Sequence, residues 1–388
     1  MKKFWIIAGE SSGDIYGAAL AEELRQLGAA RGETVEISGM GGAAMIKAGV
    51  KVKVDSTELG VIGIFEVLKS IFTFIRIFFY LLKEVKADRP DAVILIDYPG
   101  FNLRFAKKLY KLGIPVYWYV SPQVWVWGKK RLPVLAKICT KMLVIFPFEV
   151  EVFAQTPLKA DFVGHPLVDI VDSRKDPSIV RDANAFLLLP GSRVMEIERL
   201  LPVMLESVGI LAQNHPELRF YLSTPREKIT RLCEKMITAF RDKHPDFPEI
   251  AVSTGDTGVW QQKAGTGLAA SGTVTVESAI AGLPLVVGYR VNWLSIVIAI
   301  LLSVRLFRGF FTMTNIIANK VVFEEFLQHR FSAGNIVPAV ERILPGGERR
   351  QEVETGMQEV RQMLSAQSGS AARQAALAIC EDGEMSNE

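Results

Sequence analysis

The sequence is poor in the residues that build metal centres and disulfide frameworks. Its 388 residues include three cysteines and four histidines, and neither type is clustered. It has no C-x-x-C pair, no H-E-x-x-H motif and no P-loop signature, which argues against structural zinc, a zinc hydrolase and a kinase. We therefore predict no metal and no cofactor, and the scarcity of cysteine favours a reducing, cytosolic compartment.

The sequence also has little excess of one sign of charge over the other. The 45 Lys and Arg residues nearly balance the 42 Asp and Glu residues, which leaves a formal net charge of +3. Because the two signs are interspersed, no nucleic-acid partner is expected. The chain opens with an apolar run that reaches a carboxylate already at Glu10. This is too early for the core of a signal peptide, so we expect a buried first strand there.

No uncharged stretch reaches the ~20 apolar residues that a transmembrane helix needs. Two stretches, 61–82 and 291–311, are nevertheless strongly apolar. In the first, Lys69, Arg76 and Lys83 recur at every seventh position, so they share one face of a helix. A basic strip beside Phe and Ile suits a helix that lies in the membrane interface, and a buried core helix is the alternative. For the second stretch, surface insertion, a lipid-chain pocket and plain core stay open.

The length and the pattern of apolar runs favour two domains. Strand-like runs alternate with helix-length segments, and the alternation restarts near residue 185, as in two parallel α/β units. The strand candidates are 4–8, 35–38, 92–96, 116–119, 142–145, 185–189, 220–223, 267–270 and 285–287. We predict an α/β protein with an N-terminal, membrane-facing Rossmann-like domain at 1–165 and a C-terminal one at 166–350. A helix at 351–388 is expected to pack back on the first domain or on a second subunit.

The first candidate site follows the first strand, from Gly9 to Asp14. Ligands of open α/β sheets bind at the carboxyl ends of the strands. Glu10 would repel a pyrophosphate there and suits the hydroxyls of a sugar, so Glu10, Ser12 and Asp14 are predicted to bind the acceptor or the sugar. A plain strand-to-helix turn capped by Ser12 or Asp14 is the alternative.

A second candidate is Asp97, which directly follows the aliphatic strand at 92–96. A carboxylate at such a rim is partly desolvated, which raises its basicity. It can then take a proton from an attacking hydroxyl. Asp97 is therefore our candidate general base, and a helix or turn cap is the competing interpretation.

Two glycine-containing turns in the second half are of the phosphate-binding type. One is Gly191-Ser192-Arg193, and the other is Ser271-Gly272-Thr273. Each precedes a helix whose free N–H groups can hold phosphate, and Arg193 adds bidentate contacts that help a diphosphate to leave. Glu277, one turn into the second helix, can accept ribose hydroxyls, although an exposed helix charge is the alternative. Together the two turns predict a nucleotide site.

Three further features are weak by themselves. Trp125 and Trp127 follow a strand at alternating positions, which favours core anchors over the lining of a cleft. Asn315 and Glu325 flank a short apolar segment. Neither position predicts a role without further information.

In their order and spacing, these motifs resemble the lipid-A-disaccharide synthase family of bacterial glycosyltransferases along nearly the whole chain. The residues that carry the resemblance are 9–14 (GESSGD), 39–42 (GMGG), 63–68 (GIFEVL), 97–102 (DYPGFN), 121–127 (SPQVWVW), 189–193 (LPGSR) with Glu196-Ile197, 271–273 (SGT) with Glu277, and 314–318 (TNIIA) with Glu325. So many distinctive segments in one order are hard to obtain by chance.

The resemblance implies two Rossmann-like domains facing a cleft, the type B arrangement of glycosyltransferases. The implied reaction joins UDP-2,3-diacylglucosamine to 2,3-diacylglucosamine 1-phosphate, with inversion, to give a β-1,6-linked disaccharide and UDP. Asp97 would accept the proton of the acceptor 6-hydroxyl, and Arg193 would take the charge that builds on the β-phosphate. The resemblance adds Asn315 to the UDP site and Glu325 to the acceptor or sugar site.

The resemblance also implies a location and an assembly. It implies peripheral attachment to the cytoplasmic face of the inner membrane and a homodimer with exchanged C-terminal segments. The sequence departs from the family pattern at Ser11, at Gly100 and at 312–314. Gly100 stands where a second acidic residue is frequent, which leaves Asp97 the firmer choice of base.

Three alternatives have different chemistry. A UDP-N-acetylglucosamine transferase with a polyprenyl-linked acceptor shares the expected fold, but its first loop is richer in glycine and histidine than residues 9–14. A soluble UDP-sugar epimerase would leave both apolar stretches unexplained. A non-catalytic membrane adaptor would be indifferent to replacement of Asp97 or Arg193, and the paired phosphate turns argue against it.

Overall fold

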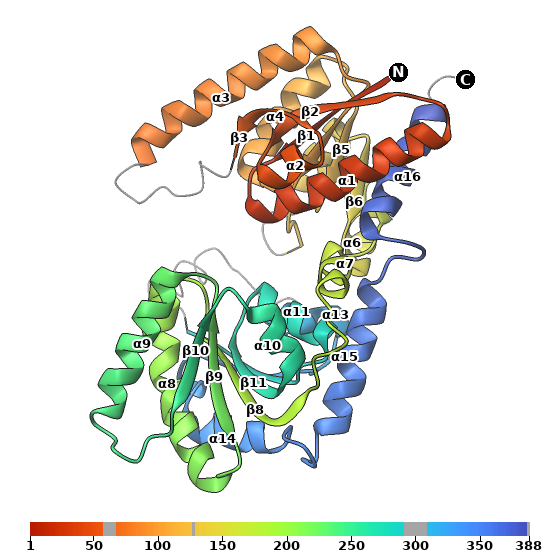
Figure 1. Ribbon diagram of the computed structural model, residues 1–388. Helices are drawn as coiled ribbons and strands as arrows, with labels where there is room; N and C mark the ends of the chain where they lie inside the picture. The colour runs from red at the N-terminus through yellow and green to blue at the C-terminus, as the bar shows by residue number, and fades with distance from the viewer. Residues whose placement is uncertain (57–66, 126–128, 291–308, 386–388) are drawn as a thin grey trace. The chain divides into compact units, whose positions relative to one another are not determined.

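The structure is a computed structural model that describes residues 1–56, 67–125, 129–290 and 309–385 (Figure 1). It divides into two compact units. Unit 1 comprises Met1–Pro166 and Leu364–Glu388, and unit 2 comprises Leu167–Met363. Within the described residues each unit has one parallel sheet, which confirms the predicted α/β class.

The sheet of unit 1 has seven described strands in the order β3-β2-β1-β4-β5-β6-β7. The strands are β1 (Lys2–Ala8), β2 (Val35–Gly41), β3 (Lys51–Asp55), β4 (Ala92–Ile96), β5 (Val116–Tyr119), β6 (Lys141–Val144) and β7 (Lys159–Phe162). All neighbours pair in parallel. The strand order reverses between β1 and β4, and such a switch point is where open α/β sheets bind their ligands.

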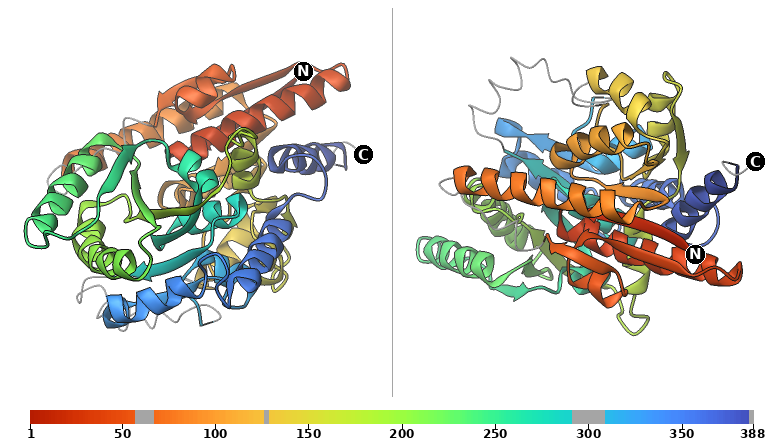
Figure 2. Two further views of the ribbon diagram at one scale, coloured as in Figure 1. Left: turned by 60° about the horizontal axis from the view of Figure 1, so that its bottom comes forward. Right: turned by 90° about the horizontal axis from the view of Figure 1, so that it is seen from above.

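Helices cover both faces of this sheet. They are α1 (Ser11–Ala30), α2 (Ala43–Lys47), α3 (Val67–Asp88), α4 (Pro99–Lys111), α5 (Leu132–Ile138), α6 (Pro147–Phe153) and α16 (Ala371–Met385). Leu81 of α3, Phe105 of α4 and Leu135 of α5 share a buried cluster with Trp5 and Val93 of the central strands. Because alternate strand residues face opposite ways, α1 packs on the other face. Figures 1 and 2 show α3 as a long helix on the outside of unit 1.

The sheet of unit 2 has six described strands in the order β10-β9-β8-β11-β12-β13. They are β8 (Asp182–Leu189), β9 (Arg219–Thr224), β10 (Ile250–Thr254), β11 (Ala264–Ala270), β12 (Leu285–Tyr289) and β13 (Glu324–Leu327). The pairing is again parallel. The switch point of this unit lies between β8 and β11.

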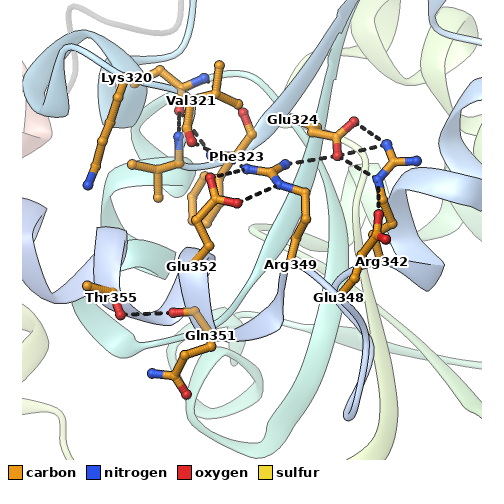
Figure 3. Close-up of polar contacts among 12 residues, drawn as sticks. Lys320, Val321, Phe323, Glu324, Arg342, Glu348, Arg349, Gln351, Glu352 and Thr355 are labelled. Atoms are coloured by element: carbon orange, nitrogen blue, oxygen red, sulfur yellow. Dashed lines mark hydrogen bonds and ion pairs between the residues drawn. The ribbon is translucent and has the colours of Figure 1, made fainter.

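The helices of unit 2 are α7 (Pro166–Ser173), α8 (Val194–Asn214), α9 (Glu227–Arg241), α10 (Thr257–Lys263), α11 (Thr273–Ala281), α13 (Met313–Ala318), α14 (Ala333–Glu341) and α15 (Arg350–Leu364). One charged cluster fixes the start of α15. Glu324 on β13 accepts hydrogen bonds from Arg342 and from Arg349 (Figure 3). Arg349 also pairs with Glu352 of α15.

The C-terminal helical pattern is two helices rather than one. The turn between α15 and α16 contains Gly369 in the left-handed region, at φ +66°. Arg361 of α15 pairs with Asp172 in unit 2, whereas Arg373 of α16 pairs with Glu23 of α1 in unit 1. The helix α16 lies along α1 (Figure 1). The last helix of this chain therefore packs on the first unit.

Candidate functional site

The loops after β1 and β4 meet at the switch point of unit 1. A Cβ atom on Gly9 would lie 2.3 Å from the ring of Tyr98, so the approach of these loops requires glycine at position 9. Asp97 and Tyr98 have φ of +45° and +49°, and Val120 after β5 has φ of +64°. Left-handed non-glycine residues store strain and cluster at functional sites. Three of them follow two neighbouring strands here.

Hydrogen bonds to its main chain fix the position of Asp97, and its carboxylate lies at the rim of the sheet. Its N–H donates to the carbonyl of Tyr119 at 3.1 Å, and its carbonyl accepts from Asn102 Nδ2 at 2.8 Å. Burial, and secondarily the charge of Glu10, raises the pKa of Asp97 to about 6. A carboxyl group with that pKa is ionised at neutral pH and is a far better base than an ordinary aspartate. This geometry supports the predicted role.

The other predicted residues of the first loop differ in their exposure to solvent. Glu10 and Ser12 are exposed at the start of α1. Asp14 is buried, and its two oxygens accept backbone N–H groups of residues 42, 44 and 45 at 2.6 to 3.0 Å. Both oxygens of Asp14 therefore help to hold α2 against α1, and a role in binding the acceptor or the sugar stays a prediction.

In unit 2 a pocket of about 510 Å³ lies at the carboxyl ends of β8, β9 and β11. The predicted UDP residues that line it are Gly191, Ser192, Arg193, Ser271, Gly272, Thr273 and Glu277. The helices α8 and α11 begin at this pocket, directly after Arg193 and Gly272. Their first N–H groups have no partner within the helix, so they present positive charge to an anion. The two turns that were predicted separately form one pocket.

Arg193 stands at the mouth of this pocket. Its guanidinium bonds Glu196 Oε1 at 3.1 Å, but its side chain is 77% exposed. A surface ion pair of this kind contributes little, typically ~0–1 kcal/mol. The guanidinium can therefore exchange Glu196 for a phosphate at small cost.

Glu277 lies deeper in the pocket. Burial raises its pKa, while the charge of Arg174 and a hydrogen bond from Gln261 act in the opposite direction. Arg174 also lines the pocket, as do Thr257 and Gly258. Sequence reasoning missed all three. The turn at 255–258 could have been recognised, because Gly and Thr follow a strand there. Arg174 could not, because it follows α7, which is far from α11 in the sequence, and no motif surrounds it.

Asn315 and Glu325 are hydrogen-bonded to each other and lie outside these two turns in the sequence. Asn315 bonds the main chain of Val322 and Phe323. Glu325 accepts from the N–H groups of Phe311 and Thr312 and from Asn315. Neither residue lines the pocket of unit 2. Their contacts support a role in fixing α13, so a ligand role for them stays a prediction.

A groove of about 890 Å³ runs between α3 and α4 in unit 1, beginning at Tyr98 beside Asp97. Phe72 and Phe79 of α3 are 73% and 59% exposed, so this end of α3 is an apolar surface. Residues 57–66 lie outside the described structure, and so does most of the second apolar stretch, 291–308. Among the described residues, no helix combines the length and the apolarity that a membrane crossing requires.

The predicted core role of Trp125 has support. Trp125 is buried and donates to the carboxylate of Glu149, as does Ser121. Burial raises the pKa of Glu149 to about 7. These contacts tie the loop after β5 to α6. Trp127 lies outside the described residues.

Two Rossmann-like units, one with a basic carboxylate and one with a phosphate-type pocket, define the class of type B glycosyltransferases and nucleotide-sugar epimerases. Solved structures agree on the fold. A UDP-GlcNAc 2-epimerase from Neisseria meningitidis has a TM-score of 0.59 at 12% identity, over 98% of this chain and 99% of that one. A glycosyltransferase of kitacinnamycin has a TM-score of 0.60 at 14% identity, over 98% of each chain.

Closer relatives identify the family. The family model described as lipid-A-disaccharide synthetase matches residues 4–379. The lipid-A-disaccharide synthase of Koribacter versatilis is 36% identical over 98% of both chains. That of Syntrophus aciditrophicus is 35% identical over 96% of both. The chain belongs to the lipid-A-disaccharide synthase family, and it is a glycosyltransferase that forms the lipid A disaccharide precursor. The resemblance noted in the sequence is confirmed.

Proposed function

We propose that the chain transfers a diacylglucosamine unit from UDP-2,3-diacylglucosamine to the 6-hydroxyl of 2,3-diacylglucosamine 1-phosphate, with inversion. The observation that carries this proposal is the strained, half-buried Asp97 at the switch point of unit 1, with its pKa raised to about 6. The helices α8 and α11 begin at the pocket of unit 2, and this pocket is the matching site for the nucleotide diphosphate.

In this reaction the acceptor oxygen forms a bond to C1 of the donor while the bond from C1 to the β-phosphate oxygen breaks. Asp97 takes the proton of the attacking hydroxyl. Arg193 and the first N–H groups of α8 and α11 stabilise the negative charge of the leaving UDP. Glu277 and Thr273, which line the same pocket, receive the nucleoside. Glu10, whose charge acts on Asp97, and Ser12, exposed at the start of α1, contact the acceptor sugar.

We further propose that the chain binds the cytoplasmic face of the inner membrane peripherally and functions there as a homodimer. Support for membrane binding comes from the exposed apolar side chains of α3, chiefly Phe72, Ile75 and Phe79. An amphipathic helix of this kind binds by burying its apolar face at the level of the acyl chains. The chain then reaches its acylated substrates while it stays bound to the membrane surface.

The test is acceptor-dependent release of UDP from the diacylated donor in detergent micelles. Asp97→Asn keeps the shape of the side chain and removes the base, so kcat should fall by about 100-fold or more. The matched control is Asp91→Asn, since Asp91 precedes β4 at the opposite end of the same strand and its carboxylate accepts a hydrogen bond from the main chain of Lys3. Full activity of Asp97→Asn would contradict the assigned base.

Arg193→Gln should likewise lower kcat by about 100-fold, because one donor to the developing charge is lost. Arg231→Gln is its control, since Arg231 has the same exposure and a similar surface pair on α9. If the unaltered chain turns over UDP-N-acetylglucosamine but not the diacylated donor, the proposed substrates are wrong.

A further inference from the structure

The groove between α3 and α4 has two chemically different walls. The α3 wall is aromatic and aliphatic, with Phe74, Ile75, Phe78 and Phe79. The α4 wall carries a row of cations. The cations that line the groove are Arg104, Lys107, Lys108 and Lys111. A site that is apolar on one side and cationic on the other fits a ligand that is both acylated and anionic.

The cations of this row are not neutralised within the described part of the chain. The helix α4 contains no Asp or Glu, and none of its four cations forms an ion pair with a described carboxylate. All four are exposed. Their spacing of three to four residues places them along one side of the helix. The row therefore presents concentrated positive charge beside an apolar surface.

We propose that the α4 row is the binding site for the phosphate monoester of the acylated acceptor, with Arg104 and Lys107 as its principal contacts. This inference rests on the proposed function. Arg104 lies about 6 Å along the helix axis from Gly100, whereas Lys111 lies about 16 Å from it. Arg104 Nη1 donates to the carbonyl of Gly100 at 2.6 Å, which holds the guanidinium near the end of the groove next to Asp97 and leaves its other N–H groups available.

The position of the groove favours the acceptor over the general lipid surface. The reaction involves a diphosphate on the donor and a monoester on the acceptor, and the pocket of unit 2 accounts for the diphosphate. The groove begins at Tyr98, the residue after the candidate base. An acceptor whose 6-hydroxyl lies at Asp97 therefore has its acyl chains and its phosphate at this groove. A guanidinium and an ammonium are the side chains best suited to a phosphate there.

The experiment compares two acceptors in neutral detergent micelles: 2,3-diacylglucosamine 1-phosphate and the same sugar with a free 1-hydroxyl. For the phosphorylated acceptor, Arg104→Gln should lower kcat/KM by about tenfold or more, through KM. For the dephosphorylated acceptor, the same variant should stay within a factor of about two of the unaltered chain. Lys107→Gln should behave similarly. Lys86→Gln, an exposed cation of α3 that does not line the groove, should leave both values unchanged.

Two results would overturn the phosphate site. One is an equal loss with both acceptors, which would mean that Arg104 acts on the fold or on the acyl chains. The other is unchanged selectivity together with weaker binding to vesicles that contain phosphatidylglycerol, which would assign the row to anionic membrane lipid. Absence of turnover by the unaltered chain would instead contradict the proposed function, so the two failures are distinguishable.

Discussion

At the scale of single residues, the electrostatic coupling of Asp97 and Glu10 makes the reaction depend on pH in a defined way. Burial and Glu10 both raise the pKa of Asp97, to about 6. A base must be ionised, so kcat/KM should fall about tenfold per pH unit below that pKa and be level above it. Replacement of Glu10 by Gln removes a neighbouring negative charge. The pKa of Asp97 then falls, and the acidic limb should move to lower pH.

The measurement is a pH profile of kcat/KM for the unaltered chain and for Glu10→Gln. Glu22→Gln is a suitable control, because Glu22 lies on α1 but is absent from the charges that shift Asp97. An acidic limb that stays in place in Glu10→Gln would mean that another group limits the rate at low pH.

Individual residues also show what the sequence can and cannot predict. The position and burial of Asp97 were predictable, because it directly follows a continuously aliphatic strand; its role as the base stays a prediction. The hydrogen bonds of Asp14 were not predictable, since its partners lie at residues 42 to 45 and only the folded chain brings them together. The same holds for Asn315, which is occupied by the main chain of residues 322 and 323. A polar side chain in a motif has the same appearance whether it binds a ligand or a neighbouring loop.

At the scale of helices and strands, central strands were easier to predict than edge strands. The strand β4 is buried along its whole length, so its sequence is continuously apolar, as parallel central strands are. The edge strand β3 has the sequence KVKVD and no buried residue. The strand β13 is short and carries Glu324 and Glu325. A run of apolar residues indicates that a segment is buried, not that it pairs with a neighbouring strand. Edge strands such as β3 and β13 are therefore not predicted from apolar runs.

The stability of unit 2 should depend on Glu324, the first residue of β13. Glu324 is the shared acceptor of Arg342 and Arg349 (Figure 3), and these contacts lower its pKa although burial opposes them. Glu324→Gln should destabilise unit 2 by about 1–3 kcal/mol, because Arg342 and Arg349 lose the carboxylate that they share, which is more buried than their remaining partners Glu348 and Glu352. Glu352→Gln, whose side chain is 60% exposed, should cost under about 1 kcal/mol. Denaturant unfolding at neutral pH measures both, and equal losses would contradict the argument.

At the scale of the whole molecule, the functional groups are divided between units with separate cores. The proposed general base and the proposed acceptor groove belong to unit 1, and the described residues that line the proposed nucleotide pocket all belong to unit 2. The sequence indicated this division through the restart of its strand pattern. It did not indicate that α15 and α16 pack on different units, because the break at residues 365–370 is short and both helices are amphipathic.

The division predicts how UDP affects the chain in solution. A ligand that binds only the folded form stabilises the structure around its site, and local opening is not uniform across a protein. Saturating UDP should therefore slow amide hydrogen exchange most strongly at 191–197, 255–258 and 271–277. The loops at 9–14 and 97–102 should change little without acceptor. In Arg193→Gln the protection should be weaker at the same UDP concentration, whereas Arg231→Gln should match the unaltered chain. Protection centred on 97–102 instead would place the nucleotide in unit 1 and reverse the assignment of the two sites.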